Sequence, residues 1–325
     1  MNRKLKFGAL SFAVLIGLTG CGLSPSTGTT PDANPGLIKD DPSLSGDAKV
    51  TVTSKSFTEQ LILGKISVIA LNVAGYNVTD LTNVPGSQPA RQLLLSGDAS
   101  VLWEYIGTAW LTYLGHEKPV IGAEKQWQAV HDEDVANGIV WGEPAPLNNT
   151  YAMAMNREVA DRLGITKLSE MSKLDSKELT FCVDPEFNSR RDGLTPMLEH
   201  YGMKRGSQIK EDNIGLYDVG AIYQATAEGA CNFGEVFTTD GRIKALDLTV
   251  LEDDKQYFPS YNAAPAFNAE FLEKNPGVQD VMAQIAPLLT DEVLLDLNYQ
   301  VDVEGREPAD VAYEWMLNEG LITAP

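Results

Sequence analysis

The sequence predicts an α/β fold with two lobes, and three observations lead to this prediction. Strand-like and helix-like patterns alternate along the chain, which is typical of a mostly parallel sheet covered by helices on both faces. The alternation begins near residue 48 and starts again after Tyr151. The chain has 325 residues, which is room for two domains of ordinary size. We therefore expect two successive α/β units, with any ligand bound beyond the carboxyl ends of their strands.

The first unit begins with a strand over residues 49–54, in which apolar Val50 and Val52 alternate with polar residues. The motif Ser56-x-x-Glu59 then predicts a capping box at the start of a long helix, whose apolar residues recur at helical spacing. The later elements expected in this unit are a strand over 76–79, a helix over 89–96 and a strand over 100–105.

The second unit repeats this alternation after Tyr151, and the end of the chain is expected to be helical. The tail from about residue 276 is assigned to helices because Val278, Met282 and Ile285 fall on one helical face. In the second unit we expect helices over 157–163, 193–201 and 220–228, and strands over 179–183 and 231–237.

The composition argues against several classes of function. There are 25 lysines and arginines against 45 aspartates and glutamates, which gives a formal net charge of -20. A surface this acidic repels phosphate backbones, so we expect no nucleic-acid partner. The chain has three histidines, three cysteines and no C-x-x-C pair, so neither a metal centre nor another cofactor is expected.

Residues 1–20 have the pattern of a signal peptide. Basic residues begin the segment, and the apolar run over 7–18 that follows is too short to span a membrane as a helix. The segment ends in Leu18-Thr19-Gly20-Cys21, which is similar to a bacterial lipobox. We therefore expect cleavage before Cys21 and a lipid on its thiol. The alternative is an ordinary signal peptide followed by an incidental cysteine.

The stretch over residues 21–47 is expected to be a flexible linker between the lipid and the folded part. It is rich in Ser, Thr, Pro, Gly and Asp and has few large apolar residues, so it cannot bury enough surface to fold. Together with the signal, this linker predicts a protein held at the outer face of the cytoplasmic membrane.

Two cysteines lie in the folded part, Cys182 and Cys231. They fall in strands that we expect to be neighbours in the second unit. They either form a disulfide that braces this unit or remain two buried thiols. An extracytoplasmic compartment would allow a disulfide to persist.

Several short segments then stand in a specific order. They are SKSFTEQ at 54–60, EYIGT at 104–108, NNTY at 148–151, PEFNSRRDG at 185–193, TTDG at 238–241 and YFPSY at 257–261. From about Val50 to the C-terminus, this order resembles the glycine betaine/carnitine/choline-binding proteins of osmoprotectant ABC importers.

The resemblance implies a type II periplasmic-binding-protein fold, in which two lobes enclose a central ligand cleft and are joined by two hinge crossings. Lobe I would cover residues 48–148 and 259–325, and lobe II would cover 149–258. The partners implied are an ABC permease and its ATPase subunits.

The resemblance also implies an aromatic cage at Tyr105, Tyr151, Phe237 and Tyr261. A quaternary ammonium has a diffuse charge and no N–H donor, so electron-rich ring faces hold it better than hydrogen-bonding groups do. At the position of Phe237 the family usually has tyrosine, so a hydroxyl is missing here.

The implied carboxylate-binding residues are Lys55, Thr108 and Arg190, and Glu186 matches a position that lines the same cleft. Arg190 offers a planar fork of donors, and Lys55 and Thr108 lie near helix starts, where an anion is favoured. Alternatively, Glu186 pairs with Arg190 four residues later if that stretch is helical.

We therefore expect a monomeric binding protein that captures glycine betaine, carnitine, proline betaine or choline for an importer. One alternative is the same fold with another small solute, such as an amino acid or ectoine. A secreted enzyme is the other alternative, but the chain has no Gly-x-Ser-x-Gly, His-Glu-x-x-His or Walker-type phosphate loop.

Overall fold

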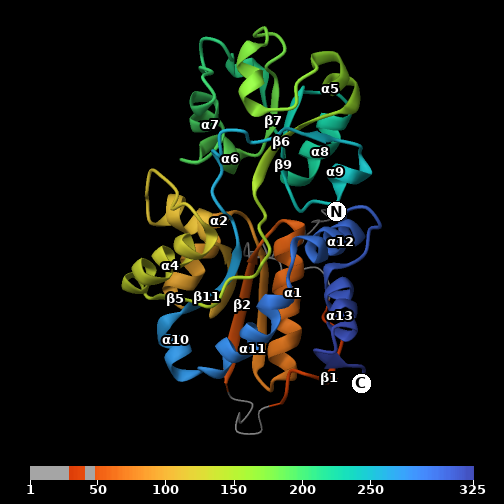
Figure 1. Cartoon of the computed structure of the whole chain (residues 1–325). Coiled ribbons are helices and arrows are strands. Elements are labelled where there is room, and N and C mark those ends of the chain that lie inside the picture. Colours follow the sequence, from red (N-terminus) through yellow and green to blue (C-terminus); the bar gives the residue numbers. More distant parts are fainter. Residues whose placement is uncertain (1–28, 41–47) are drawn as a thin grey trace, which may run out of the picture.

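The chain forms two α/β units, each built around its own five-stranded sheet (Figure 1). The computed structural model describes residues 29–40 and 48–325. We call the unit around the sheet β3-β2-β4-β11-β5 lobe I and the unit around the sheet β10-β6-β9-β7-β8 lobe II. The predicted fold class, α/β with two lobes, is confirmed.

Lobe I is centred on α1, which lies between the sheet and α13 and contacts β2 and β3 (Figure 1). Nearly every side chain of α1 is buried, as expected of a helix that is apolar on more than one face. The strands are β2 (Lys49–Lys55), β3 (Asn77–Val84), β4 (Val101–Tyr105), β5 (Ile139–Trp141) and β11 (Ala263–Asn268). The main helices are α1 (Thr58–Val73), α2 (Ser87–Ser96), α3 (Ile106–Thr108), α4 (Ala123–Asp134), α10 (Ala269–Lys274), α11 (Gly277–Ile285), α12 (Asp291–Asp302) and α13 (Pro308–Asn318).

Lobe II has a core of its own and contains a disulfide. Cys182 and Cys231 are bonded, with their Cα atoms 5.8 Å apart. The strands are β6 (Tyr151–Met155), β7 (Phe181–Val183), β8 (Ile214–Leu216), β9 (Phe233–Phe237) and β10 (Thr249–Val250). The helices are α5 (Arg157–Leu163), α6 (Pro185–Ser189), α7 (Leu194–His200), α8 (Val219–Ala227) and α9 (Arg242–Ala245).

Both sheets are mixed rather than mostly parallel. The strands that run against their neighbours are β11, antiparallel to β4 and β5, and β6, antiparallel to β9 and β10. Each of these strands follows a passage of the chain from one lobe to the other, between β5 and β6 and between β10 and β11. The chain enters each sheet from the side of the other lobe, where β4 and β9 end. The returning strand therefore runs in the opposite direction.

A short segment before lobe I is ordered against the end of the chain. Strand β1 (Asn34–Pro35) pairs antiparallel with β12 (Ile322–Thr323), and the N–H of Ile38 donates to the carbonyl of Leu321 at 3.0 Å. The Ile38 side chain is fully buried in the core of lobe I. The prediction of a flexible linker throughout residues 21–47 is therefore wrong for this segment, because a buried isoleucine and backbone pairing fasten it.

The predicted signal peptide and Cys21 lie outside the described residues. Within residues 29–40 and 48–325, no helix combines the length and apolar character needed to cross a membrane.

Candidate ligand-binding site

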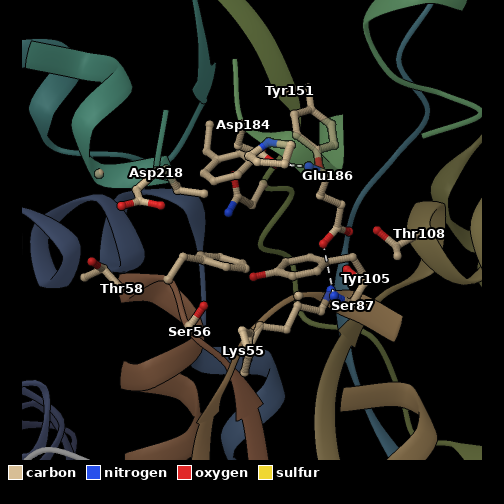
Figure 2. Close-up of a pocket in the computed structure, with 18 of the residues that line it drawn as sticks. Lys55, Ser56, Thr58, Ser87, Tyr105, Thr108, Tyr151, Asp184, Glu186 and Asp218 are labelled. Carbon is tan, nitrogen blue, oxygen red and sulfur yellow. Dashed lines mark hydrogen bonds between the residues drawn. The ribbon is translucent and has the colours of Figure 1, made fainter. Parts of the chain in front are cut away.

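A pocket of about 560 Å³ lies between the two lobes (Figure 2). Its walls come largely from the strand ends that face the other lobe, where β2, β4 and β9 finish and β6 begins. The structure brings every predicted pocket residue to this one cavity: Lys55, Tyr105, Thr108, Tyr151, Glu186, Arg190, Phe237 and Tyr261.

Aromatic rings from both lobes form a continuous cluster in this pocket. Tyr151 lies 5.3 Å from Phe237 and meets Tyr261 edge-on at 5.5 Å, measured between ring centroids. Phe57 lies 5.3 Å from Phe237 and 6.1 Å from Tyr105. Tyr105 and Tyr261 are buried, whereas Tyr151 and Phe237 are half-buried with faces on the cavity.

Phe57 is a pocket residue that was not predicted from the sequence. It joins Tyr105 of lobe I to Phe237 of lobe II and so completes the ring cluster. It is the N-cap residue of α1, in extended backbone, two positions after the end of β2. Its position just after a predicted strand is the sequence signal that points to the cleft.

The predicted capping box is wrong. Helix α1 begins at Thr58, and its N-cap Phe57 makes no side-chain hydrogen bond to the helix. Ser56 is exposed and lies one residue too early, while Glu59 turns into the protein and is 2% exposed.

Glu59 instead collects hydrogen bonds from both lobes. Its carboxylate accepts from the hydroxyls of Tyr105 and Thr239, both at 2.7 Å. The amides of Asn149 and Asn298 donate to it at 2.9 and 3.3 Å. Burial raises the pKa of Glu59, although these hydrogen bonds act in the opposite direction.

Lys55 reaches the pocket already paired with an acid. Its Nζ atom lies 2.6 Å from Glu104 and 4.9 Å from the centroid of the Tyr105 ring. Glu104 also accepts a hydrogen bond of 2.7 Å from the hydroxyl of Tyr113. The ammonium group is thus held beside the Tyr105 ring, and a buried carboxylate partly neutralises it.

Arg190 does not present a free fork to the pocket, which differs from the expectation. Its Nε and Nη2 atoms donate to both carboxylate oxygens of Asp192, at 2.7 and 2.6 Å. The same Nη2 also donates to Thr108 of lobe I at 3.3 Å, and the Tyr261 hydroxyl donates to Asp192 at 2.5 Å. Asp192 therefore orients a cation and an aromatic ring of the pocket together.

Glu186 projects into the pocket from α6 of lobe II and reaches lobe I (Figure 2). One carboxylate oxygen accepts from Arg190 Nη1 at 3.1 Å, which is the ion pair that the sequence left open as an alternative. The other oxygen accepts from the backbone N–H of Ser87 at 3.0 Å. Burial alone would raise the pKa of Glu186, but the charges of Lys55 and Arg190 and the Ser87 N–H more than offset it, so the pKa is lowered.

This arrangement, an aromatic cluster beside a polar edge in a cleft between two lobes, agrees with the comparisons to known proteins. Residues 48–318 match the family profile described as the substrate-binding domain of the ABC-type glycine betaine transport system. The chain belongs to this family. The family consists of solute-binding components of ABC transporters, so the prediction of a binding protein rather than an enzyme is confirmed.

Two relatives and one solved structure are similar to this chain over most of its length. A glycine-betaine-binding protein of Pseudomonas aeruginosa PAO1 is 37% identical over 279 residues, which are 83% of this chain and 88% of the relative. The ergothioneine transport permease/ergothioneine binding protein EgtU of Helicobacter pylori is 28% identical over 84% of this chain, but this covers 48% of that longer protein. The crystal structure of a glycine betaine/carnitine/choline ABC transporter protein superposes with a TM-score of 0.66 at 26% identity, over 84% of this chain and 99% of that chain. The match to this binding-protein fold confirms the predicted architecture.

Proposed function

We propose that the protein is an extracytoplasmic receptor that captures a quaternary-ammonium solute between its lobes and delivers it to an ABC importer. The observation that carries this proposal is the continuous ring cluster of Tyr105, Phe57, Phe237, Tyr151 and Tyr261 on the wall of the pocket. Each ring face that contacts a methylated cation contributes about 0.5–2 kcal/mol, depending on desolvation. Several faces together hold the cation and exclude water.

The polar edge of the pocket suits the other end of a betaine. Lys55, Thr108 and Arg190 lie along this edge, and Ser87 presents the first backbone N–H of α2 there. A carboxylate placed among these groups would accept hydrogen bonds from two cationic side chains and from the N-terminus of a helix. Glycine betaine, carnitine and proline betaine carry such a carboxylate, whereas choline shares only their quaternary ammonium group.

The lobe boundaries that we propose are 48–148 with 259–325, and 149–258. A ligand that touches both lobes stabilises the closed arrangement by its differential affinity for that state. The permease would recognise the closed form. We place the protein, as a monomer, at the outer face of the cytoplasmic membrane, held by a lipid on Cys21.

Ranked affinities test the ligand class. Isothermal titration calorimetry on the purified folded part would compare glycine betaine, proline betaine, carnitine and choline with ectoine and a free amino acid. Ergothioneine belongs in the series because it combines a trimethylammonium group with a carboxylate and is named for one relative. We expect the quaternary-ammonium compounds to bind more tightly than ectoine or the amino acid; the reverse order would refute the proposal.

The cage is tested separately by truncating Tyr151 to alanine. Tyr151 contacts Phe237, Tyr261 and Phe187, and it lines the pocket. Its loss should weaken quaternary-ammonium binding about tenfold. Trp127→Ala is the control, because Trp127 packs away from the pocket and donates to the carbonyl of Gly142. Equal losses in the two variants would remove the cage from the mechanism.

A further inference from the structure

The carboxylate of Glu186 stands among the groups that we assign to the carboxylate of the ligand. It accepts from Arg190 at 3.1 Å and from the backbone N–H of Ser87 at 3.0 Å. The charge of Lys55 acts on it strongly enough to help lower its pKa. The side chain is one-third exposed and faces the cavity, so it is not locked inside the protein.

The geometry at the N-terminus of α2 also suits an anion at this edge. The N-cap of this ten-residue helix is Gly86, which has no side chain to accept from the first turn. The acceptor comes from the other lobe instead, as Glu186 Oε2. Gly86 has a φ of 83°, and a Cβ atom there would lie 3.3 Å from that oxygen, so glycine permits the close approach.

We propose that Glu186 is an internal carboxylate that occupies the place of the ligand carboxylate, so that a carboxylate-bearing ligand must displace it to bind. This inference rests on the proposed function. Glu186 reaches across the cleft to cap α2 and pairs with Arg190 within its own lobe. When a betaine enters, its carboxylate takes over these donors and the Glu186 side chain turns toward the opening of the pocket.

A consequence is that Glu186 sets the selectivity between zwitterions and plain cations. A betaine competes with Glu186 for the same donors and is repelled by its charge. Choline has no carboxylate, so it leaves the Glu186 contacts intact and is attracted by the negative charge. The native glutamate therefore lowers betaine affinity relative to choline affinity.

The test is the variant Glu186→Gln, which keeps the size of the side chain and removes its charge. Titration calorimetry would give the dissociation constants of glycine betaine and choline for the native protein and the variant. We expect glycine betaine to bind more tightly and choline to bind less tightly, so that the ratio of the two constants shifts about tenfold in favour of glycine betaine. Glu158→Gln, at an exposed position on α5 in the same lobe, is the matched control and should leave the ratio unchanged.

The remaining outcomes separate the inference from the proposed function. If Glu186→Gln changes both affinities by the same factor, Glu186 only holds the lobes together and the inference is refuted while the proposed function stands. If the native protein binds neither compound, the proposed function fails first, and the inference fails with it. Glu186→Ala provides a second neutral variant, should the glutamine form new hydrogen bonds to Ser87 or Arg190, and the same shift in ratio is expected from it.

Discussion

The hydroxyl of Tyr105 donates a hydrogen bond of 2.7 Å to the carboxylate of Glu59. Through this bond an aromatic wall of the pocket is fixed to a buried group that also accepts from Asn149 and Thr239, on the lobe II side. The position of the ring and the contact between the lobes therefore depend on the same carboxylate.

Replacing Glu59 with alanine should destabilise the protein strongly. The change leaves the buried donors of Tyr105, Asn149 and Thr239 without their acceptor, and the expected loss is about 3–5 kcal/mol in the free energy of unfolding. Urea unfolding followed by circular dichroism measures it. Glu158→Ala, at an exposed site, should cost less than about 0.5 kcal/mol. A small effect at Glu59 would mean that water replaces the missing acceptor.

Phe57→Ala should lower the ligand affinity while changing the free energy of unfolding by a smaller amount. The ring touches Tyr105 and Phe237 and lies on the pocket, so its loss opens the ring cluster at its centre, and we expect affinity to fall about fivefold to tenfold. Calorimetry on the variant measures this. Phe271→Ala is the matched control, because Phe271 packs against the core of lobe I and does not line the pocket. It should lower stability and leave affinity unchanged; an affinity loss as large as that of Phe57→Ala would contradict a specific role for Phe57.

Ile38→Ala and Leu37→Ala form a neighbouring pair with opposite expectations. Ile38 is 0% exposed and Leu37 is 61% exposed. Truncation of the buried residue should cost about 2–4 kcal/mol, whereas truncation of the exposed one should cost less than about 0.5 kcal/mol. Denaturant unfolding of a chain that retains residues 29–40 compares them. Equal, small effects would show that this segment does not contribute to the stability of lobe I.

Asp302 should make the stability depend on pH. Burial raises its pKa to about 6, despite the charge of Arg242 at 3.4 Å, and the negative charge of Asp240 adds to the rise. A carboxyl with a raised folded-state pKa contributes its full stability below the unfolded value of 3.8 and loses it as the pH rises through about 6.

The variant Asp302→Asn isolates this dependence because its side chain stays neutral. The unfolding free energy of the native protein, relative to the variant, should fall by about 2–3 kcal/mol between pH 4 and pH 7. Urea titrations at several pH values measure the difference. A constant difference would show that Asp302 keeps an ordinary pKa in the folded protein.

Regular elements of the fold could be predicted because their patterns are local. The helix over 157–163 coincides with α5, and the strand over 231–237 overlaps β9. The direction of β6 and β11 could not be predicted, because it depends on where the chain re-enters each sheet after crossing between lobes. The order of segments predicted which side chains share the pocket, since strand ends converge at one edge of a sheet.

The hydrogen-bond partners of those side chains were harder to predict from the sequence. Arg190 was expected to offer a free fork, but Asp192, two residues later, takes it because α6 ends at Ser189 and the backbone leaves the helical path. The spacing of Glu59 from Ser56 fits the local capping-box motif, so the sequence alone predicts a cap. The actual partners of Glu59, Asn149 and Thr239, are distant in the sequence, and no local pattern identifies them.

The pairing of β1 with β12 lies at the end of lobe I away from lobe II (Figure 1). The chain that precedes Asn34 is therefore joined to the folded part through lobe I and not through lobe II. Lobe II is connected to this β1–β12 pairing only indirectly, through the two crossings and the contacts across the cleft. In the lipid-anchored receptor that we propose, lobe II would close over a ligand without moving the end of lobe I that is joined to the anchor.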